Sequence, residues 1–262
     1  MSTVNGGPVM STDLRLVVDR ARSLGYAIPT ANTLYALDTF VTSLKNLSVW
    51  NACDYIRVSA YNNTALQNFA LINLRNPTGS LAFTVGGMLY QTQGFRGTKT
   101  AGTYLNSGIN LSTTTNYTQN SATRMYVLYQ ATTNGIAQGI DGVLGFSTEN
   151  QISNNSGSAQ KINQGTGNMN VSADMTGTGS LAIVRTSSTS VFTYNKGTQT
   201  IGTVNSAARV NANQLENTTF NVPGDAGISF SLYGSALTVT QLDGIRSSFN
   251  TYLTAIGLTP FA

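Results

Sequence analysis

Asparagine side chains recur in two long polar stretches of the sequence, residues 98–121 and 149–178, and the first stretch also contains Tyr104 and Tyr117. Aromatic rings can pack on a sugar ring while neighbouring amides bond its hydroxyl groups. Both stretches are predicted to be long polar loops or irregular edge strands. Loops of this length in a compact domain are usually functional or mobile, so the stretches are predicted to contact a glycan or a partner protein. The candidate contact residues are Tyr104, Asn106, Asn110, Tyr117, Asn154 and Asn155.

Tyrosines within the strand-like segment are expected to behave differently. Tyr126 and Tyr129 are predicted to line a β-sheet core with their hydroxyls at its edge. Tyr104 and Tyr117 are predicted to be exposed, because they lie among Thr, Asn and Ser residues.

Residues for the common catalytic reactions are missing. The chain has no histidine, which excludes a Ser-His-Asp triad and most zinc sites. Its one cysteine, Cys53, excludes an internal disulfide and, lying between apolar residues, is predicted to be buried. No glycine-rich phosphate loop links a strand to a helix. The sequence therefore predicts a protein without catalytic residues and without a cofactor.

Paired carboxylates leave one enzymatic alternative open. The chain has two glutamates, Glu149 and Glu216, and a glycoside hydrolase needs two carboxyl groups roughly 5–10 Å apart. Asp141 and Glu149 flank the predicted strand 143–146, and a distant pair of acids could also meet in space. Hydrolysis of a glycan is the least favoured of three functions.

Oxygen ligands for calcium are present, but without a recognisable pattern. Asp141, Asn150, Asn154 and Asn155 could supply them, yet no spacing resembles an EF-hand loop. Asparagine-rich loops are more often simple turns. No metal site is predicted.

Charge is scarce, at 9% of residues with a net charge of +4. The basic residues are dispersed, which argues against a nucleic-acid interface. No apolar run approaches the roughly 20 residues of a membrane span. Residues 1–11 lack the basic and apolar regions of a secretory signal, so synthesis in a cytoplasm is expected.

Helical periodicity appears at both ends of the sequence. Apolar residues follow the caps at Ser11–Asp13 with helical spacing up to Gly25, and a second stripe follows Pro29 and Thr30. A third helix begins near Thr238 and ends at Gly257.

Short β-prone segments separated by turn residues fill the middle of the chain. Lys196 and Gly197 are predicted to form a hairpin turn after Asn195. Because no helix falls between the segments, they predict a β-sandwich or jelly roll. The predicted strands are 54–60, 69–74, 81–85, 88–95, 124–130, 143–146, 179–186, 190–195, 198–205 and 227–232.

Several segments, taken in their order along the chain, resemble a family of phage virion structural proteins with a concanavalin A-like (laminin G-like) jelly roll. They are LYALDTFVTSLKNLSVWNACDYIRV at 34–58, ALINLRNP at 70–77, the strands at 81–87 and 88–94, and GISFSLYGSALTVTQLDGIRSSFNTYLTAIG at 227–257. The glutamate-rich catalytic strand of related glucanases has no counterpart here, and the resemblance implies no catalytic residue.

The resemblance implies a mainly β fold, a concanavalin A-like jelly-roll sandwich with two N-terminal helices and one C-terminal amphipathic helix. The expected division is an N-terminal arm with helices at 1–50, a sandwich at 51–237 and a C-terminal helix packed on it at 238–262.

The implied function is that of a non-enzymatic virion component, such as a capsid decoration, a head fibre or a tail part. It would be made in the host cytoplasm and would act through contacts with other virion proteins, as a homo-oligomer. The alternative is a carbohydrate-binding adhesin or receptor-binding tail protein that recognises a host surface glycan.

Overall fold

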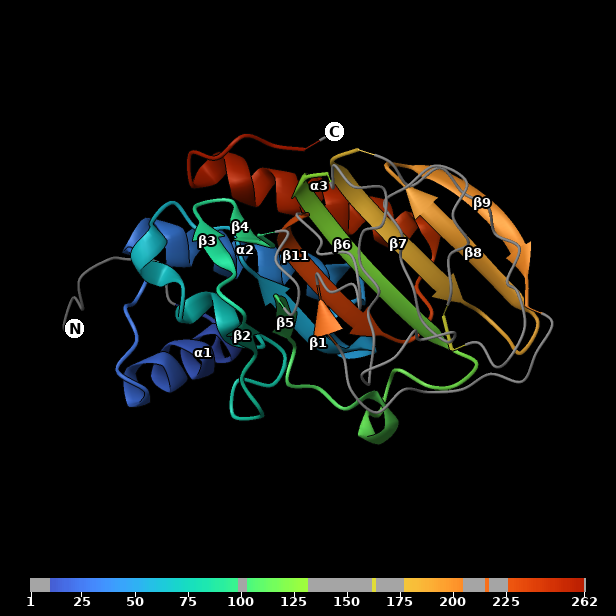
Figure 1. Ribbon diagram of the computed structural model, residues 1–262, viewed down its shortest axis with the longest axis horizontal. Coiled ribbons are helices and arrows are strands. Elements are labelled where there is room, and N and C mark those ends of the chain that lie inside the picture. The colour runs from blue at the N-terminus through green and yellow to red at the C-terminus, as the bar shows by residue number, and fades with distance from the viewer. Residues whose placement is uncertain are drawn as a thin grey trace, which may run out of the picture.

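The computed structural model describes residues 10–98, 103–131, 162–163, 177–204, 215–216 and 226–261. Within these residues the chain forms two antiparallel sheets and three α-helices (Figure 1). The prediction of a mainly β protein with two N-terminal helices and one C-terminal helix is confirmed at this level.

All three predicted helices form: α1 (Thr12–Ser23), α2 (Ala31–Asn46) and α3 (Val239–Ala255). Each begins at a hydroxyl N-cap whose side chain accepts a backbone N–H, as Ser11, Thr30 and Thr238 do. The cap of α3 is a full capping box, since Gln241 also bonds back to Thr238. Local signals in the chain therefore determine where these helices begin.

The larger sheet has eight strands in the order β3-β4-β11-β6-β7-β8-β9, with β1 also pairing β11. Its strands are β1 (Cys53–Val58), β3 (Leu89–Gln91), β4 (Gly94–Arg96), β6 (Ala122–Gln130), β7 (Gly179–Arg185), β8 (Ser190–Asn195), β9 (Thr198–Thr203) and β11 (Gly227–Gly234). The smaller sheet has the order β10-β5-β2 and contains β2 (Phe83–Val85), β5 (Tyr104–Asn106) and β10 (Leu215–Glu216).

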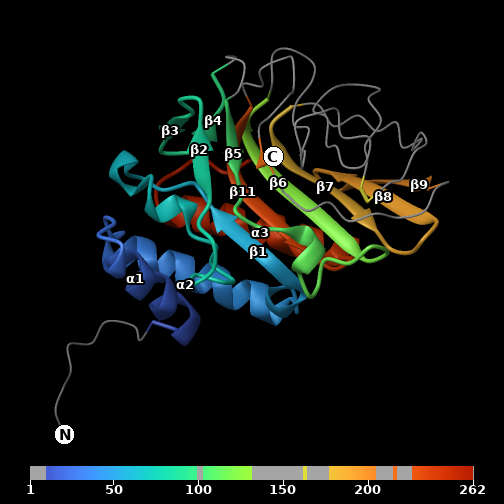
Figure 2. The same cartoon turned by 60° about the horizontal axis from the view of Figure 1, so that its bottom comes forward.

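The helices cover one face of the larger sheet, as Figure 2 shows. Phe40 of α2, Phe249 of α3 and Phe230 of β11 meet there, with ring centroids 5.2 to 5.8 Å apart. Aromatic contacts at these distances are favourable beyond the burial of apolar area. The hydrophobic cluster around them, the principal cluster of the protein, joins residues of all three helices and both sheets.

The opposite face of the larger sheet is buried as well, and it is unusually polar. Tyr55 stacks on Tyr233 with centroids 4.9 Å apart, and the hydroxyl of Tyr126 lies 3.0 Å from that of Tyr233. Arg124 and Arg185 are fully buried beside them. The prediction that Tyr126 lines a core is confirmed, whereas Tyr129 is only half-buried.

The hairpin between β8 and β9 forms as predicted. Lys196 and Gly197 both have positive φ, 51° and 97°, which is the signature of a tight two-residue turn that matches the strand twist. Thr198 pairs directly with Asn195 across this turn.

Two predicted strands are wrong in detail. Residues 69–74 contain a 3₁₀-helix, Phe69–Leu71, because both faces of this apolar run are buried and no alternation distinguishes it as a strand. Asn73 follows it and accepts a hydrogen bond from the Ile56 backbone N–H, and Leu74 N–H donates to the Ile56 carbonyl. The predicted strand 88–95 is two short strands, β3 and β4, because the chain turns at 92–93.

The polar stretch 98–121 is not an irregular loop throughout. It contains β5 and a 3₁₀-helix, Leu111–Thr113. The predicted strand 143–146 lies outside the described residues. The division into 1–50, 51–237 and 238–262 stays a prediction, although the principal cluster draws residues from all three segments.

Candidate functional site

An aromatic side chain and a carboxamide share the outer face of the smaller sheet. Phe83 of β2 pairs directly with Asn106 of β5, so their side chains lie on the same face of the sheet. Tyr104 shares that face because it is two residues from Asn106 along the strand. The intervening Leu105 points the other way and is buried in the principal cluster.

Phe83 is 49% exposed, in contrast to Leu105 at 1%. The sequence did not single out Phe83, because in LAFTV nearly every residue is apolar and alternation alone cannot assign an outer face. The structure thus identifies an exposed aromatic ring that sequence reasoning missed.

A surface hollow of about 250 Å³ lies beside this ring. Its lining residues come from the segment before β2, from β2 itself, and from β5 and the turn after it. They are Ser80, Leu81, Phe83, Asn106, Gly108, Ile109 and Asn110. The structure therefore brings together two of the predicted contact residues, Asn106 and Asn110.

The carbonyl ends of both asparagines are held by the chain itself. Asn106 Oδ1 accepts the Gly108 backbone N–H at 2.8 Å, and Asn110 Oδ1 accepts the Ser112 backbone N–H at 2.9 Å. Among the described residues, neither Nδ2 amino group has a hydrogen-bond partner. Each amide is therefore held in place with its donor end available to a ligand.

Gly108 shapes the turn that carries these amides. Its φ is +71°, a left-handed conformation that glycine adopts without strain. A β-carbon on Gly108 would lie 2.5 Å from the Leu81 carbonyl oxygen. The chain at Gly108 and the chain at Leu81 therefore approach closely, and together they form the wall of the hollow.

Tyr104 lies next to the hollow but does not line it, and it is half-buried rather than fully exposed.

The prediction that Tyr117 is exposed is wrong, since it is 1% exposed. Its hydroxyl donates to Asn163 Oδ1 at 2.9 Å and accepts from Arg124 Nε at 3.0 Å. Burial raises the pKa of the Tyr117 phenol, and Arg124 opposes part of that rise. Asn163 lies 46 residues from Tyr117 in the sequence, so the buried Tyr117 hydroxyl anchors distant parts of the chain to each other.

Asp54 fixes the backbone of the same loop. Its carboxylate accepts backbone N–H groups of Thr115, Asn116 and Tyr117 at 2.7 to 3.2 Å. This attaches residues 115–117 to β1.

The other predicted contact residues, Asn154 and Asn155, lie outside the described residues. So do Asp141, Glu149 and Asn150, which entered the hydrolase and calcium hypotheses. These parts of the sequence analysis stay predictions.

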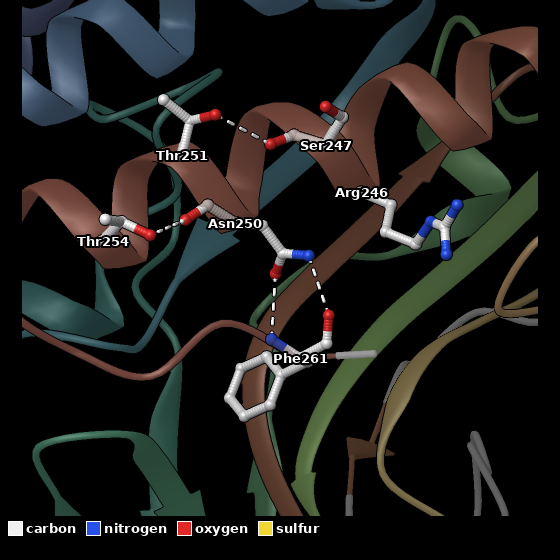
Figure 3. Close-up of a pocket in the computed structure, with 6 residues that line it drawn as sticks. All are labelled: Arg246, Ser247, Asn250, Thr251, Thr254 and Phe261. Atoms are coloured by element: carbon white, nitrogen blue, oxygen red, sulfur yellow. Dashed lines mark hydrogen bonds between the residues drawn. The ribbon is translucent and has the colours of Figure 1, made fainter.

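A second hollow, of about 460 Å³, lies along α3 (Figure 3). Its polar groups already bond to the chain: Asn250 Nδ2 donates to the Phe261 carbonyl, and Asn250 Oδ1 accepts the Phe261 N–H. The hydroxyls of Thr251 and Thr254 donate to carbonyls of their own helix. The C-terminal segment thus bonds to the residues that line this hollow. The hollow therefore offers a ligand fewer unbonded donors and acceptors than the hollow beside Phe83.

The aspartates with described side chains are all engaged in structural contacts. Asp13 pairs with Lys45, Asp19 with Arg22, and Asp38 accepts from Ser11. Asp54 holds the loop at 115–117, and Asp243 accepts from Tyr194.

Metal ligands do not cluster in the part of the chain that the structure describes. It contains no group of three or more His, Cys, Asp or Glu side chains that could hold a metal ion. None of the helices found there has the length and apolar character needed to cross a bilayer.

Comparisons with known proteins return structures of carbohydrate-active enzymes. No protein-family model and no curated protein sequence matches the chain. Domain 4 of the extracellular arabinanase AbnA from Geobacillus stearothermophilus, solved with arabinotriose, is 15% identical with a TM-score of 0.44. That match covers 73% of this chain and 99% of the arabinanase domain.

A Trypanosoma rangeli sialidase mutant displaying trans-sialidase activity is 9% identical with a TM-score of 0.46. The match covers 81% of this chain and 39% of the sialidase. An α-L-arabinofuranosidase is 12% identical with a TM-score of 0.34, over 66% of this chain and 44% of that one. This chain thus spans less than half the length of either enzyme.

Proposed function

We propose that the protein binds carbohydrate, without cleaving it, through the hollow beside Phe83. The observation that carries the proposal is the pairing of an exposed aromatic ring with two amides, Asn106 and Asn110, whose amino ends are available to donate. A sugar offers both an apolar ring face and hydroxyl acceptors, so it matches this combination.

The dimensions of the hollow favour a small group. At about 250 Å³ it lies below the roughly 300–1,000 Å³ of pockets for drug-sized ligands. We infer that it takes one terminal or side-branch sugar unit, with the remaining glycan in solvent. None of the described residues that line the hollow carries a carboxylate, which is consistent with binding that leaves the glycosidic bond intact.

A jelly roll related to concanavalin A is the finer fold that we propose. The first and last strands of the larger sheet, β1 and β11, pair with each other, and β6 to β9 follow as an antiparallel meander. Jelly rolls are likewise built from two antiparallel sheets.

A glycan array tests the proposed function. The full chain should bind a restricted set of glycans, and Phe83→Ala should weaken that binding by roughly two- to tenfold, the worth of an aromatic contact. Leu89→Ala is the matched control because Leu89 is equally exposed, at 49%, but does not line the hollow. Absence of glycan binding, or equal losses in both variants, would contradict the proposal.

A virion structural role is the second function that we propose, and it gives the first a biological setting. The segments at 34–58, 70–77 and 227–257 support it by their resemblance to phage virion proteins, as do two exposed apolar side chains on the helices, Leu16 and Tyr35. In this setting other virion proteins are the partners, and the glycan is a host receptor.

Mass spectrometry of purified phage particles tests the virion role. Stoichiometric presence of the chain in the particles would support it, and absence from them would refute it without affecting glycan binding.

A further inference from the structure

Strand β9 forms a long edge of the larger sheet. Its register with β8 places the closing pair of the hairpin at Asn195 and Thr198. In a two-residue hairpin the closing pair exchanges hydrogen bonds, and the bonding residues then alternate along the strand. The residues of β9 that bond to β8 are therefore Thr198, Thr200 and Gly202.

The same alternation leaves Gln199, Ile201 and Thr203 with their backbone N–H and C=O groups directed away from β8. Across the described parts of the chain, these outward groups have no hydrogen-bond partner. The edge thus presents a row of backbone donors and acceptors that a further strand could pair with.

Within the described residues, β9 itself carries none of the usual protection against such pairing. Natural edge strands carry charges, prolines or bulges, or are very short. β9 has six residues, TQTIGT, with no charge and no proline, and its register with β8 is continuous. Ile201, near its centre, is 78% exposed, the most exposed of the large apolar side chains described.

We propose that β9 pairs antiparallel with β9 of a second copy of this chain, so that two sheets join into one across a two-fold axis. With the axis at Ile201, this residue faces its own counterpart, and Gln199 faces Thr203 of the second copy. The outward backbone groups of each strand are then matched, and the two exposed isoleucines bury each other.

Charge is compatible with a second copy as the occupant. The nearest charged residue along the hairpin is Lys196, in the turn. In this register the two Lys196 residues are ten positions apart, roughly 30 Å at the rise of a strand. Among the described residues of the hairpin, this pairing therefore brings no like charges together.

Light scattering on the full chain gives the first test. We expect a mass of twice 27.7 kDa at micromolar concentration. Ile201→Lys places two like charges opposite each other and should weaken the dimer by about tenfold or more. Leu16→Lys, the same change at an exposed position of α1, should leave the dimer intact. A monomer at all concentrations, or a dimer unaffected by Ile201→Lys, would overturn the proposal.

Disulfide trapping tests the register. Ile201→Cys should give a covalent dimer on oxidation, because the two cysteines meet at the axis. Thr198→Cys should not, because its two copies lie six positions apart, roughly 20 Å. Cys53 does not compete, since it is 1% exposed. Equal cross-linking at both positions would overturn the proposed register.

Discussion

Phe83 and Asn106 occupy directly opposed positions on β2 and β5, with an exposed ring beside an amide whose carbonyl end is already bonded. Ring and amide are thus placed by sheet register, and the amide is oriented by the turn that follows it. A ligand would meet donors that need little further ordering, which reduces the entropy lost on binding.

Replacing Asn106 by aspartate separates the two ends of this amide. Asn106→Asp keeps an oxygen to accept the Gly108 N–H but loses the amino donors, so glycan affinity should fall by roughly tenfold. The free energy of unfolding should change by less than about 0.5 kcal/mol. Titration calorimetry with the strongest array glycan, and urea unfolding, measure the two effects.

Asn63→Asp is the control for that variant. Asn63 makes the same kind of turn, accepting the Ala65 N–H at 2.9 Å, but lies outside the hollow. Its variant should bind glycan as the wild type does. Unchanged affinity in Asn106→Asp would remove this residue from the site.

Alanine at Gly108 should disturb the wall of the hollow. Gly108→Ala adds the strain of φ +71° to a clash with the Leu81 carbonyl, whereas Gly25→Ala adds nearly the same strain, at φ +70°, in open space. Urea unfolding should show Gly108→Ala to be less stable than Gly25→Ala by about 1–3 kcal/mol. Only Gly108→Ala should lose glycan binding, and equal effects of the two variants would contradict the described wall.

Removal of the Tyr117 hydroxyl should destabilise the protein. Tyr117→Phe deprives both Arg124 Nε and Asn163 Oδ1 of a buried partner, at a cost of about 1–3 kcal/mol in unfolding free energy. Tyr104→Phe, at a half-buried position, should cost less than about 0.5 kcal/mol. Chemical denaturation measures both, and similar stabilities would contradict an anchoring role for Tyr117.

Alkaline pH should weaken the fold through Tyr194. Burial raises the pKa of Tyr194 to about 12, and its hydrogen bond to Asp243 adds to the rise. The folded state therefore keeps a proton that the unfolded state releases near pH 10, about the ordinary value for tyrosine. Its stabilisation is present below that pH and is lost as the pH rises from about 10 to about 12.

Tyr194→Phe should accordingly make the alkaline loss of stability shallower. Urea unfolding at a series of pH values across that window measures the slope. Tyr35→Phe, at an exposed position of α2, should keep the slope of the wild type. An unchanged slope in Tyr194→Phe would show that another group controls the alkaline transition.

Elements set by local signals were predictable from the sequence. The hydroxyl caps before α1 and α2, the capping box of α3, and the turn at Lys196 and Gly197 each depend on a few adjacent residues. Their boundaries follow from short-range hydrogen bonds and from the spacing of apolar residues.

Features that depend on distant partners were not predictable. β5 forms because β2 and β10 pair with it, and β10 is more than a hundred residues away. Tyr117 is buried because Arg124 and Asn163 take up its hydroxyl. Of the residues that line the proposed site, the sequence singled out Asn106 and Asn110. It did not single out the ring of Phe83, since its face is assigned only by register.

The bonds that Asn73 and Leu74 make to Ile56 occupy the outer side of β1, and the remaining end strand, β3, has only three residues. Within the described residues, β9 is thus the sole extended margin of the larger sheet. A dimer formed through β9 leaves neither chain with another long described strand that is open to pairing, so assembly stops at two chains. A molecule with two such margins would polymerise, whereas this arrangement is self-limiting.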